Sequence, residues 1–85
     1  MEIRVTSLFE RHFKKLPQEV QRKAEKKDVI FRNNPFDRKL GTHKLHGGKK
    51  EEWSYWVDYS YRVTFIFLTS HSVLYTDIGT HDDVY

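Results

Sequence analysis

The C-terminal segment, residues 79–85, holds side chains that could move protons. It reads Gly-Thr-His-Asp-Asp-Val-Tyr and directly follows the strongly strand-like run 72–78. A free histidine has a pKa of about 6.5, which suits proton transfer near neutral pH. Because His81 is attached directly to a core strand, we predict that it is held rigidly and has a catalytic role. The alternative is a polar surface tail without a role, since chain ends are commonly poorly ordered.

Further side chains could join His81 where a loop enters the predicted sheet and the tail leaves it. They are His43, His46, Lys49 and Lys50 before the strands, Arg62 within them, and Tyr85 at the end. Metal-free RNA cleavage needs a base that takes the 2′-OH proton, cations on the phosphate, and an acid that protonates the leaving oxygen. Histidines can serve as base and acid, and Arg62 and the lysines can hold the phosphate. The set therefore favours cleavage of RNA.

Each of these residues also has an ordinary structural explanation. His43 and His46 could be plain loop residues. Aromatic residues such as Trp56 or Tyr85 could stack on unpaired bases, but in a sheet they more often serve packing. These alternatives stay open at the level of the residues alone.

No metal or cofactor is expected. His81, Asp82 and Asp83 are adjacent and so point in different directions, which makes them poor joint ligands. No Gly-rich phosphate loop opens a helix, and no Ser or Cys lies in a nucleophile motif. The other two histidines, His12 and His71, are predicted on a helix surface and at a hairpin tip, without a role.

Size and charge indicate one small domain, residues 1–85, near the lower limit for folding without disulfides or metals. There is no cysteine, the N-terminus does not resemble a secretory signal, and no apolar run approaches the roughly 20 residues of a membrane span. We therefore expect a soluble, cytoplasmic protein with no membrane partner. Every Lys and Arg except Arg62 lies in residues 1–50. This indicates a nucleic acid or acidic protein partner, unless the lysines simply solvate two helices.

The N-terminal half predicts one strand and two helices. Alternation favours a strand over residues 2–6, and Ser7-Leu8-Phe9-Glu10 has the form of a capping box with Ser7 as the cap. A second helix is predicted from Pro17, in its first turn, to about Arg32, and Asn33-Asn34-Pro35 ends it. Its apolar stripe is Val20, Ala24 and Phe31, and the residues expected to face solvent are Arg22, Lys23, Lys26 and Lys27.

The C-terminal half predicts strands over residues 53–57, 61–68 and 72–78, after a polar loop over 35–50. The order β-α-α-β-β-β predicts an α+β fold with two helices packed on one face of a small antiparallel sheet. In the central strand, period two places Tyr61, Val63, Phe65 and Phe67 on the helix side and Arg62 and Thr64 on the other. Arg62 is thus expected on a face open to solvent or ligand, beside the C-terminal cluster.

Three segments resemble the RelE/ParE superfamily of toxins from type II toxin–antitoxin systems, in particular its RelE-like and YafQ-like members. They are His43-Lys44-Leu45-His46-Gly47, the run from Trp53 through Tyr61-Arg62-Val63, and the C-terminal Gly79-Thr80-His81 with its acidic residues. The stretch from Phe9 to Pro17 is also typical of the family. The resemblance covers essentially the whole chain.

The resemblance implies a metal-independent mRNA endonuclease without a cofactor, which inhibits translation in the ribosomal A site beside 16S rRNA. It implies a cognate antitoxin as partner, with operator DNA bound only through that antitoxin. Carried over by position, the implied catalytic residues are His81, Arg62, His43 and Tyr85, and the implied RNA-binding residues are Lys44, His46, Lys49 and Lys50. YafQ-like enzymes carry a further histidine and aspartate in the first hairpin, where this chain has Trp56 and, roughly, Ser60.

Two other functions fit the same superfamily. One is a ParE-like toxin that inhibits DNA gyrase without RNA chemistry, and the other is a non-catalytic module that binds the antitoxin as a corepressor. ParE-like chains generally need no C-terminal histidine, so His81 together with Arg62 favours the nuclease.

Overall fold

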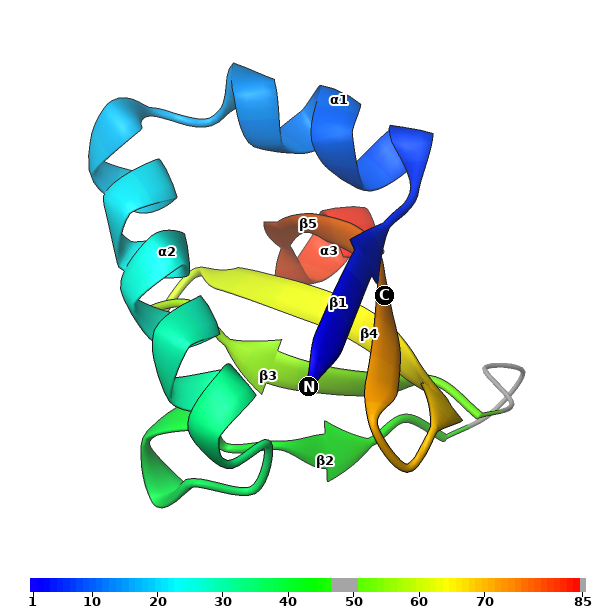
Figure 1. Cartoon of the computed structure of the whole chain (residues 1–85). Helices are drawn as coiled ribbons and strands as arrows, with labels where there is room; N and C mark the ends of the chain where they lie inside the picture. The colour runs from blue at the N-terminus through cyan, green and yellow to red at the C-terminus, as the bar shows by residue number, and fades with distance from the viewer. Residues whose placement is uncertain (47–50, 85) are drawn as a thin grey trace.

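The computed structural model of the chain describes residues 1–46 and 51–84, and this part has an α+β architecture (Figure 1). The elements are β1 (Glu2–Val5), α1 (Ser7–Lys15), α2 (Gln18–Asn33), the 3-10 helix η1 (Arg38–Leu40), β2 (His43–Lys44), β3 (Trp53–Trp56), β4 (Tyr61–Thr69), β5 (Ser72–Thr80) and α3 (His81–Val84). None of the described helices has the length and apolar character needed to span a bilayer.

The N-terminus of α1 is capped one residue earlier than predicted. The side chain of Thr6 accepts a hydrogen bond from the backbone N–H of Phe9 (3.0 Å), and its hydroxyl donates to the carbonyl of Thr76 (2.7 Å). The prediction that Ser7 caps the helix was therefore wrong, because Thr6 caps α1 and also ties its first turn to β5. Ser7 is the first residue of the helix itself.

The described strands form a five-stranded sheet in the order β1-β5-β4-β3-β2, and it is mixed rather than fully antiparallel. The pairs β5–β4, β4–β3 and β3–β2 are antiparallel, as predicted for the hairpins, but β1 pairs with β5 in parallel. The long connection from β1 through the helices and the three other strands brings the chain back in the same direction. The predicted polar loop over 35–50 was also partly wrong, since it contains η1 and the edge strand β2.

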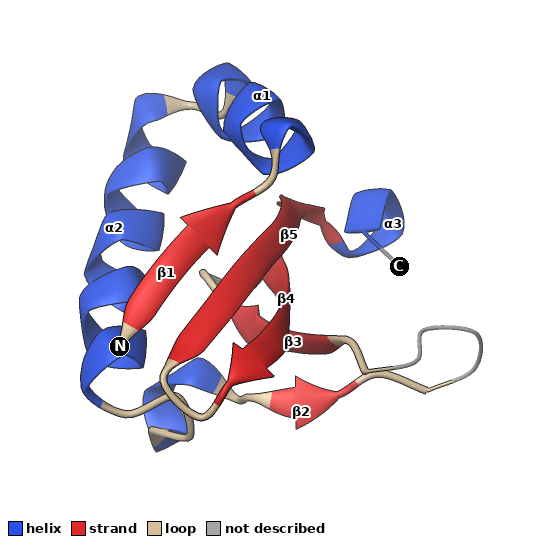
Figure 2. Cartoon of the chain, turned by 45° about the vertical axis from the view of Figure 1, so that its right-hand side comes forward, coloured by secondary structure: helices blue, strands red, loops and turns tan. Residues whose placement is uncertain are grey.

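The core lies between α2 and one face of the sheet. Phe31 of α2 is fully buried, and its ring centroid is 4.9 Å from that of Phe65, 5.1 Å from Tyr55 and 5.6 Å from Tyr75. The predicted helix stripe is confirmed, because Val20 and Ala24 are buried together with Phe31. Helix α2 thus covers one side of the sheet, and α3 lies on the other (Figure 2).

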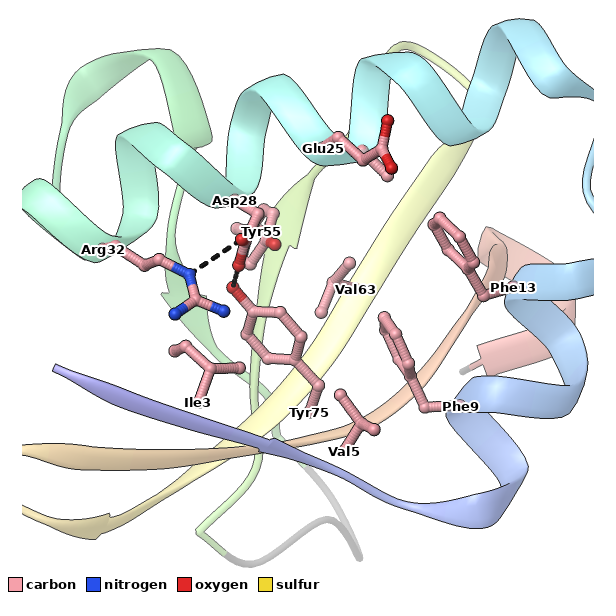
Figure 3. Close-up of a pocket in the computed structure, with 11 residues that line it drawn as sticks. Ile3, Val5, Phe9, Phe13, Glu25, Asp28, Arg32, Tyr55, Val63 and Tyr75 are labelled. Carbon is pink, nitrogen blue, oxygen red and sulfur yellow. Dashed lines mark hydrogen bonds and ion pairs between the residues drawn. The ribbon is translucent and has the colours of Figure 1, made fainter.

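A polar network closes one end of the pocket between α1, α2 and β1, which has a volume of about 190 Å³ (Figure 3). The hydroxyl of Tyr75 donates to Asp28 Oδ1 (2.7 Å), and Arg32 Nε donates to Asp28 Oδ2 (2.8 Å). Burial raises the pKa of Tyr75, and the neighbouring Tyr55 and Asp28 raise it further. Tyr75 therefore stays protonated and joins α2 to β5.

We predict that Tyr75→Phe lowers the free energy of unfolding by about 1–3 kcal/mol, because Asp28 loses a donor in a half-buried site. Urea denaturation measures this change. The matched control is Tyr59→Phe, which removes the same hydroxyl from a side chain that is 97% exposed and should leave the stability unchanged. Equal stabilities for Tyr75→Phe and the wild type would contradict the role of this network.

Candidate functional site

Strand register defines a second face of the sheet, which we call the outer face. Directly paired residues of neighbouring strands point to the same side, and successive residues alternate. Val63 and Phe65 are buried against α2, so Arg62 and Thr64 point away from it, as predicted. The outer face therefore includes His43, Ser54, Trp56, Arg62, Thr64, Asp77 and Gly79.

The centre of the outer face is not open to solvent, contrary to the prediction. Ser54 and Thr64 are fully buried, although both are polar. The hydroxyls of Thr64 and Thr76 lie 2.8 Å apart, and Thr76 Oγ1 donates to Glu52 Oε2 (3.0 Å). Glu52 comes from the segment just before β3, so this network places a carboxylate over the middle strands. Beside this buried centre, His43 on the edge strand and Trp56 next to Arg62 are exposed.

Arg62 lies on the outer face and leans toward the turn between β3 and β4. Its Nη1 donates to the carbonyl oxygens of Asp58 and Tyr59, at 3.3 Å each. Asp58 Oδ1 shapes this turn by accepting from the N–H groups of Ser60 (2.9 Å) and Tyr61 (2.8 Å). Burial opposes ionisation of Asp58, but these hydrogen bonds and Lys23 outweigh it and hold the pKa of Asp58 below its ordinary value. The turn therefore holds the guanidinium in a defined position.

The C-terminal segment is not a frayed tail, because α3 folds back onto the outer face. A Cβ atom added at Gly79 would lie 3.1 Å from Asp83 Cβ and 3.4 Å from Val84 Cγ1, and Val84 is buried. Gly79 is the cross-strand partner of Arg62, so α3 packs next to the position of Arg62 in β4. His81 begins α3 with its side chain 62% exposed, and its Nδ1 lies 3.7 Å from Asp82 Oδ1. Tyr85 lies outside the described residues.

His43 lies in β2 rather than in a loop and is exposed. Its Nδ1 is 3.0 Å from the carbonyl oxygen of Gly41, which can only accept a hydrogen bond. In the neutral ring, Nδ1 therefore carries the proton and Nε2 is the basic nitrogen. This arrangement suits a general base.

The predicted RNA-binding residues are only partly on the same face. Lys44 follows His43 and pairs with Trp53, so it points to the opposite side of the sheet. His46 is exposed at the end of the described segment. Lys49 and Lys50 lie outside the described residues. The structure thus places His43, Arg62 and α3 on the outer face and separates Lys44 from them.

A hollow of about 610 Å³, which the sequence did not predict, lies at the β3–β4 turn and is lined by Lys27, Trp56, Asp58, Tyr59 and Arg62. Lys27 was predicted to face solvent, but its Nζ donates to the carbonyl oxygens of Lys39 (3.1 Å) and Trp56 (3.3 Å). Burial lowers the pKa of Lys27, while Asp58 partly opposes this shift. Helical periodicity shows which residues face the sheet but not which residues on the flank of α2 reach the end of a strand.

His12 was predicted on a helix surface without a role. Its Nδ1 lies 2.6 Å from Asp77 Oδ1, so this contact ties α1 to β5. Within residues 1–46 and 51–84, no group of three or more His, Cys, Asp or Glu side chains is arranged to hold a metal ion.

Solved structures of known proteins share this fold. A YoeB/ParE toxin from Agrobacterium tumefaciens superimposes with a TM-score of 0.80 at 14% identity, covering 95% of this chain and 99% of that one. YafQ from Escherichia coli strain BL21(DE3) gives a TM-score of 0.79 at 19% identity, with coverages of 99% and 97%. A chain of the archaeal RelE–RelB complex from Pyrococcus horikoshii OT3 gives 0.73 at 14% identity, with coverages of 93% and 92%.

Comparisons of the sequence alone give no such match. No protein-family model matches the sequence, and no curated protein matches it. At identities below 20%, the structural likeness concerns the fold, and it confirms the fold expected from the sequence. The chain therefore has the fold of the RelE/ParE-superfamily toxins.

Proposed function

We propose that this protein is the toxin of a type II toxin–antitoxin system and that it cleaves mRNA in the ribosomal A site without a metal ion. The observation that carries the proposal is the outer face, where His43 and Arg62 point to the same side of the sheet and α3, which begins with His81, packs against that side. The fold shared with YafQ, YoeB and RelE toxins supports the same function.

In the proposed reaction, Nε2 of His43 takes the proton of the 2′-OH as O2′ attacks the adjacent phosphorus. The O2′–P bond forms, the P–O5′ bond breaks, and His81 donates a proton to the leaving O5′. Arg62 stabilises the negative charge that builds on the phosphate oxygens, since its guanidinium remains protonated throughout. Tyr85, by its position in the chain, would assist at the same end through stacking or proton transfer.

Partners follow from the same proposal. Two of the structural neighbours come from the DinJ–YafQ and RelE–RelB complexes, which supports an antitoxin as the partner of this chain. We infer that operator DNA is bound only through that antitoxin. Lys44, Lys49 and Lys50 would contribute positive charge toward mRNA and 16S rRNA, and His46 would contribute a hydrogen bond.

Induction of the protein in a bacterial host is expected to arrest growth and to produce discrete breaks in translated mRNA, because the proposed site acts on RNA. Primer extension on a reporter mRNA, with and without ribosomes, maps the breaks and tests whether the ribosome is needed. Growth arrest with intact mRNA and accumulated gyrase–DNA breaks would instead identify a ParE-like gyrase inhibitor. Antitoxin binding without toxicity would identify a corepressor.

Removing a proposed catalytic side chain is expected to slow mRNA cleavage by roughly 10²–10⁴-fold, the scale of a proton-transfer or charge-stabilising group. The variants are His43→Gln, Arg62→Ala and His81→Gln, each compared with the wild type in single-turnover cleavage and in thermal stability.

The matched control is His71→Gln, which changes an exposed histidine in the β4–β5 turn, at the opposite end of that hairpin from Arg62 and Gly79. It should cleave at the wild-type rate. Wild-type rates in all three site variants, with unchanged stability, would refute the assignment of the site.

A further inference from the structure

We propose that Trp56 is a preformed stacking platform for one unpaired base of the RNA, next to the phosphate held by Arg62. This inference rests on the proposed function and assigns a role to a residue outside the catalytic set. The platform is the indole ring of Trp56 at the hollow beside the β3–β4 turn.

One face of the indole is held against backbone. Gly41 has φ +59°, and a Cβ atom added there would lie 2.6 Å from three carbon atoms of the Trp56 ring system. Only glycine allows so close an approach, so the ring lies directly against residue 41. Trp56 is nevertheless 44% exposed to solvent. The indole therefore has a supported side and an accessible side, which a base can cover without reordering the protein.

Two cations line the same hollow as the indole. Arg62 is the direct cross-strand partner of Trp56, so their Cβ atoms lie roughly 5 Å apart on the same face. Lys27 is held at the backbone of Trp56 by its hydrogen bond to that residue's carbonyl oxygen. The carboxylate of Asp58 also lines the hollow, but it is engaged by two backbone N–H groups and by Lys23 Nζ at 3.4 Å. The hollow is thus suited to a ligand that has a planar ring and an attached negatively charged group.

A nucleotide of single-stranded RNA has both parts, a planar base and a phosphate. Stacking of a base on an aromatic side chain tolerates any base, whereas a base inside a duplex has no free face. Tyr59, which is 97% exposed at the same turn, offers a second ring at the mouth of the hollow. His43 donates to Gly41 on the other side of the platform. The stacked base would therefore lie next to the phosphate clamp Arg62, with the indole between the base and the Gly41–His43 contact.

The test is the binding of a short single-stranded RNA whose 2′-OH groups are methylated, so that it cannot be cleaved. Trp56→Ala should weaken binding by about 5- to 150-fold, the range for loss of one stacked base, and Trp56→Phe should retain most of the affinity. Gly41→Ala should also weaken binding, because the added methyl group displaces the ring. The control is Trp53→Phe, whose ring packs against Phe36 and Phe67 away from the hollow and should bind as the wild type does.

Thermal unfolding of each variant separates loss of the platform from loss of the fold. Wild-type RNA affinity in folded Trp56→Ala would overturn the platform while leaving the proposed nuclease intact. Unchanged RNA binding with weaker antitoxin binding in that variant would assign the surface to the antitoxin instead. If the wild type fails to bind this RNA both free and in a programmed ribosome, both the platform and the proposed function are wrong.

Discussion

The positions of Arg62 and the other described residues of the outer face depend on the packing of Phe31 against the middle of the sheet. Its fully buried ring contacts Tyr55, Phe65 and Tyr75, which come from β3, β4 and β5. This contact fixes which side of each strand faces α2. Because side chains alternate along a strand, a slip of one residue in β4 would bury Arg62 and expose Phe65. The core therefore sets the chemistry of the outer face.

The outer face is then shaped by close contacts with backbone rather than by a second apolar layer. Gly79 lets α3 pack next to the strand that carries Arg62, and Gly41 lets Trp56 lie flat beside the strand that carries His43. The buried hydroxyls of Thr64 and Thr76 and the carboxylate of Glu52 fill the centre with a bonded polar network. The exposed side chains of Trp56 and His43 lie beside this buried centre, next to Arg62 and on the edge strand β2 respectively.

The strands, their order in the chain and the outward position of Arg62 could be predicted because polar and apolar residues alternate from Tyr61 to Phe65, before the apolar run 65–68. The parallel pairing of β1 could not, since pairing between distant segments leaves no local pattern. Nor could the short strand β2, whose two residues are both polar and carry no alternation. The Trp56 platform depends on the approach of Gly41, a contact between the end of η1 and β3 that neither residue reveals alone. Lys27 was misplaced for the same reason, because its partners are carbonyl groups far along the chain.

The most direct test of the central claim is the chemistry of the RNA ends made by the purified protein on ribosome-bound mRNA. Attack by the 2′-OH predicts a 5′-hydroxyl on one fragment and a 2′,3′-cyclic phosphate, or its hydrolysis product, on the other. Mass spectrometry of the fragments distinguishes these ends from those of hydrolysis by water. Fragments that carry a 5′-phosphate and a 3′-hydroxyl, or the absence of any cleavage, would contradict the account.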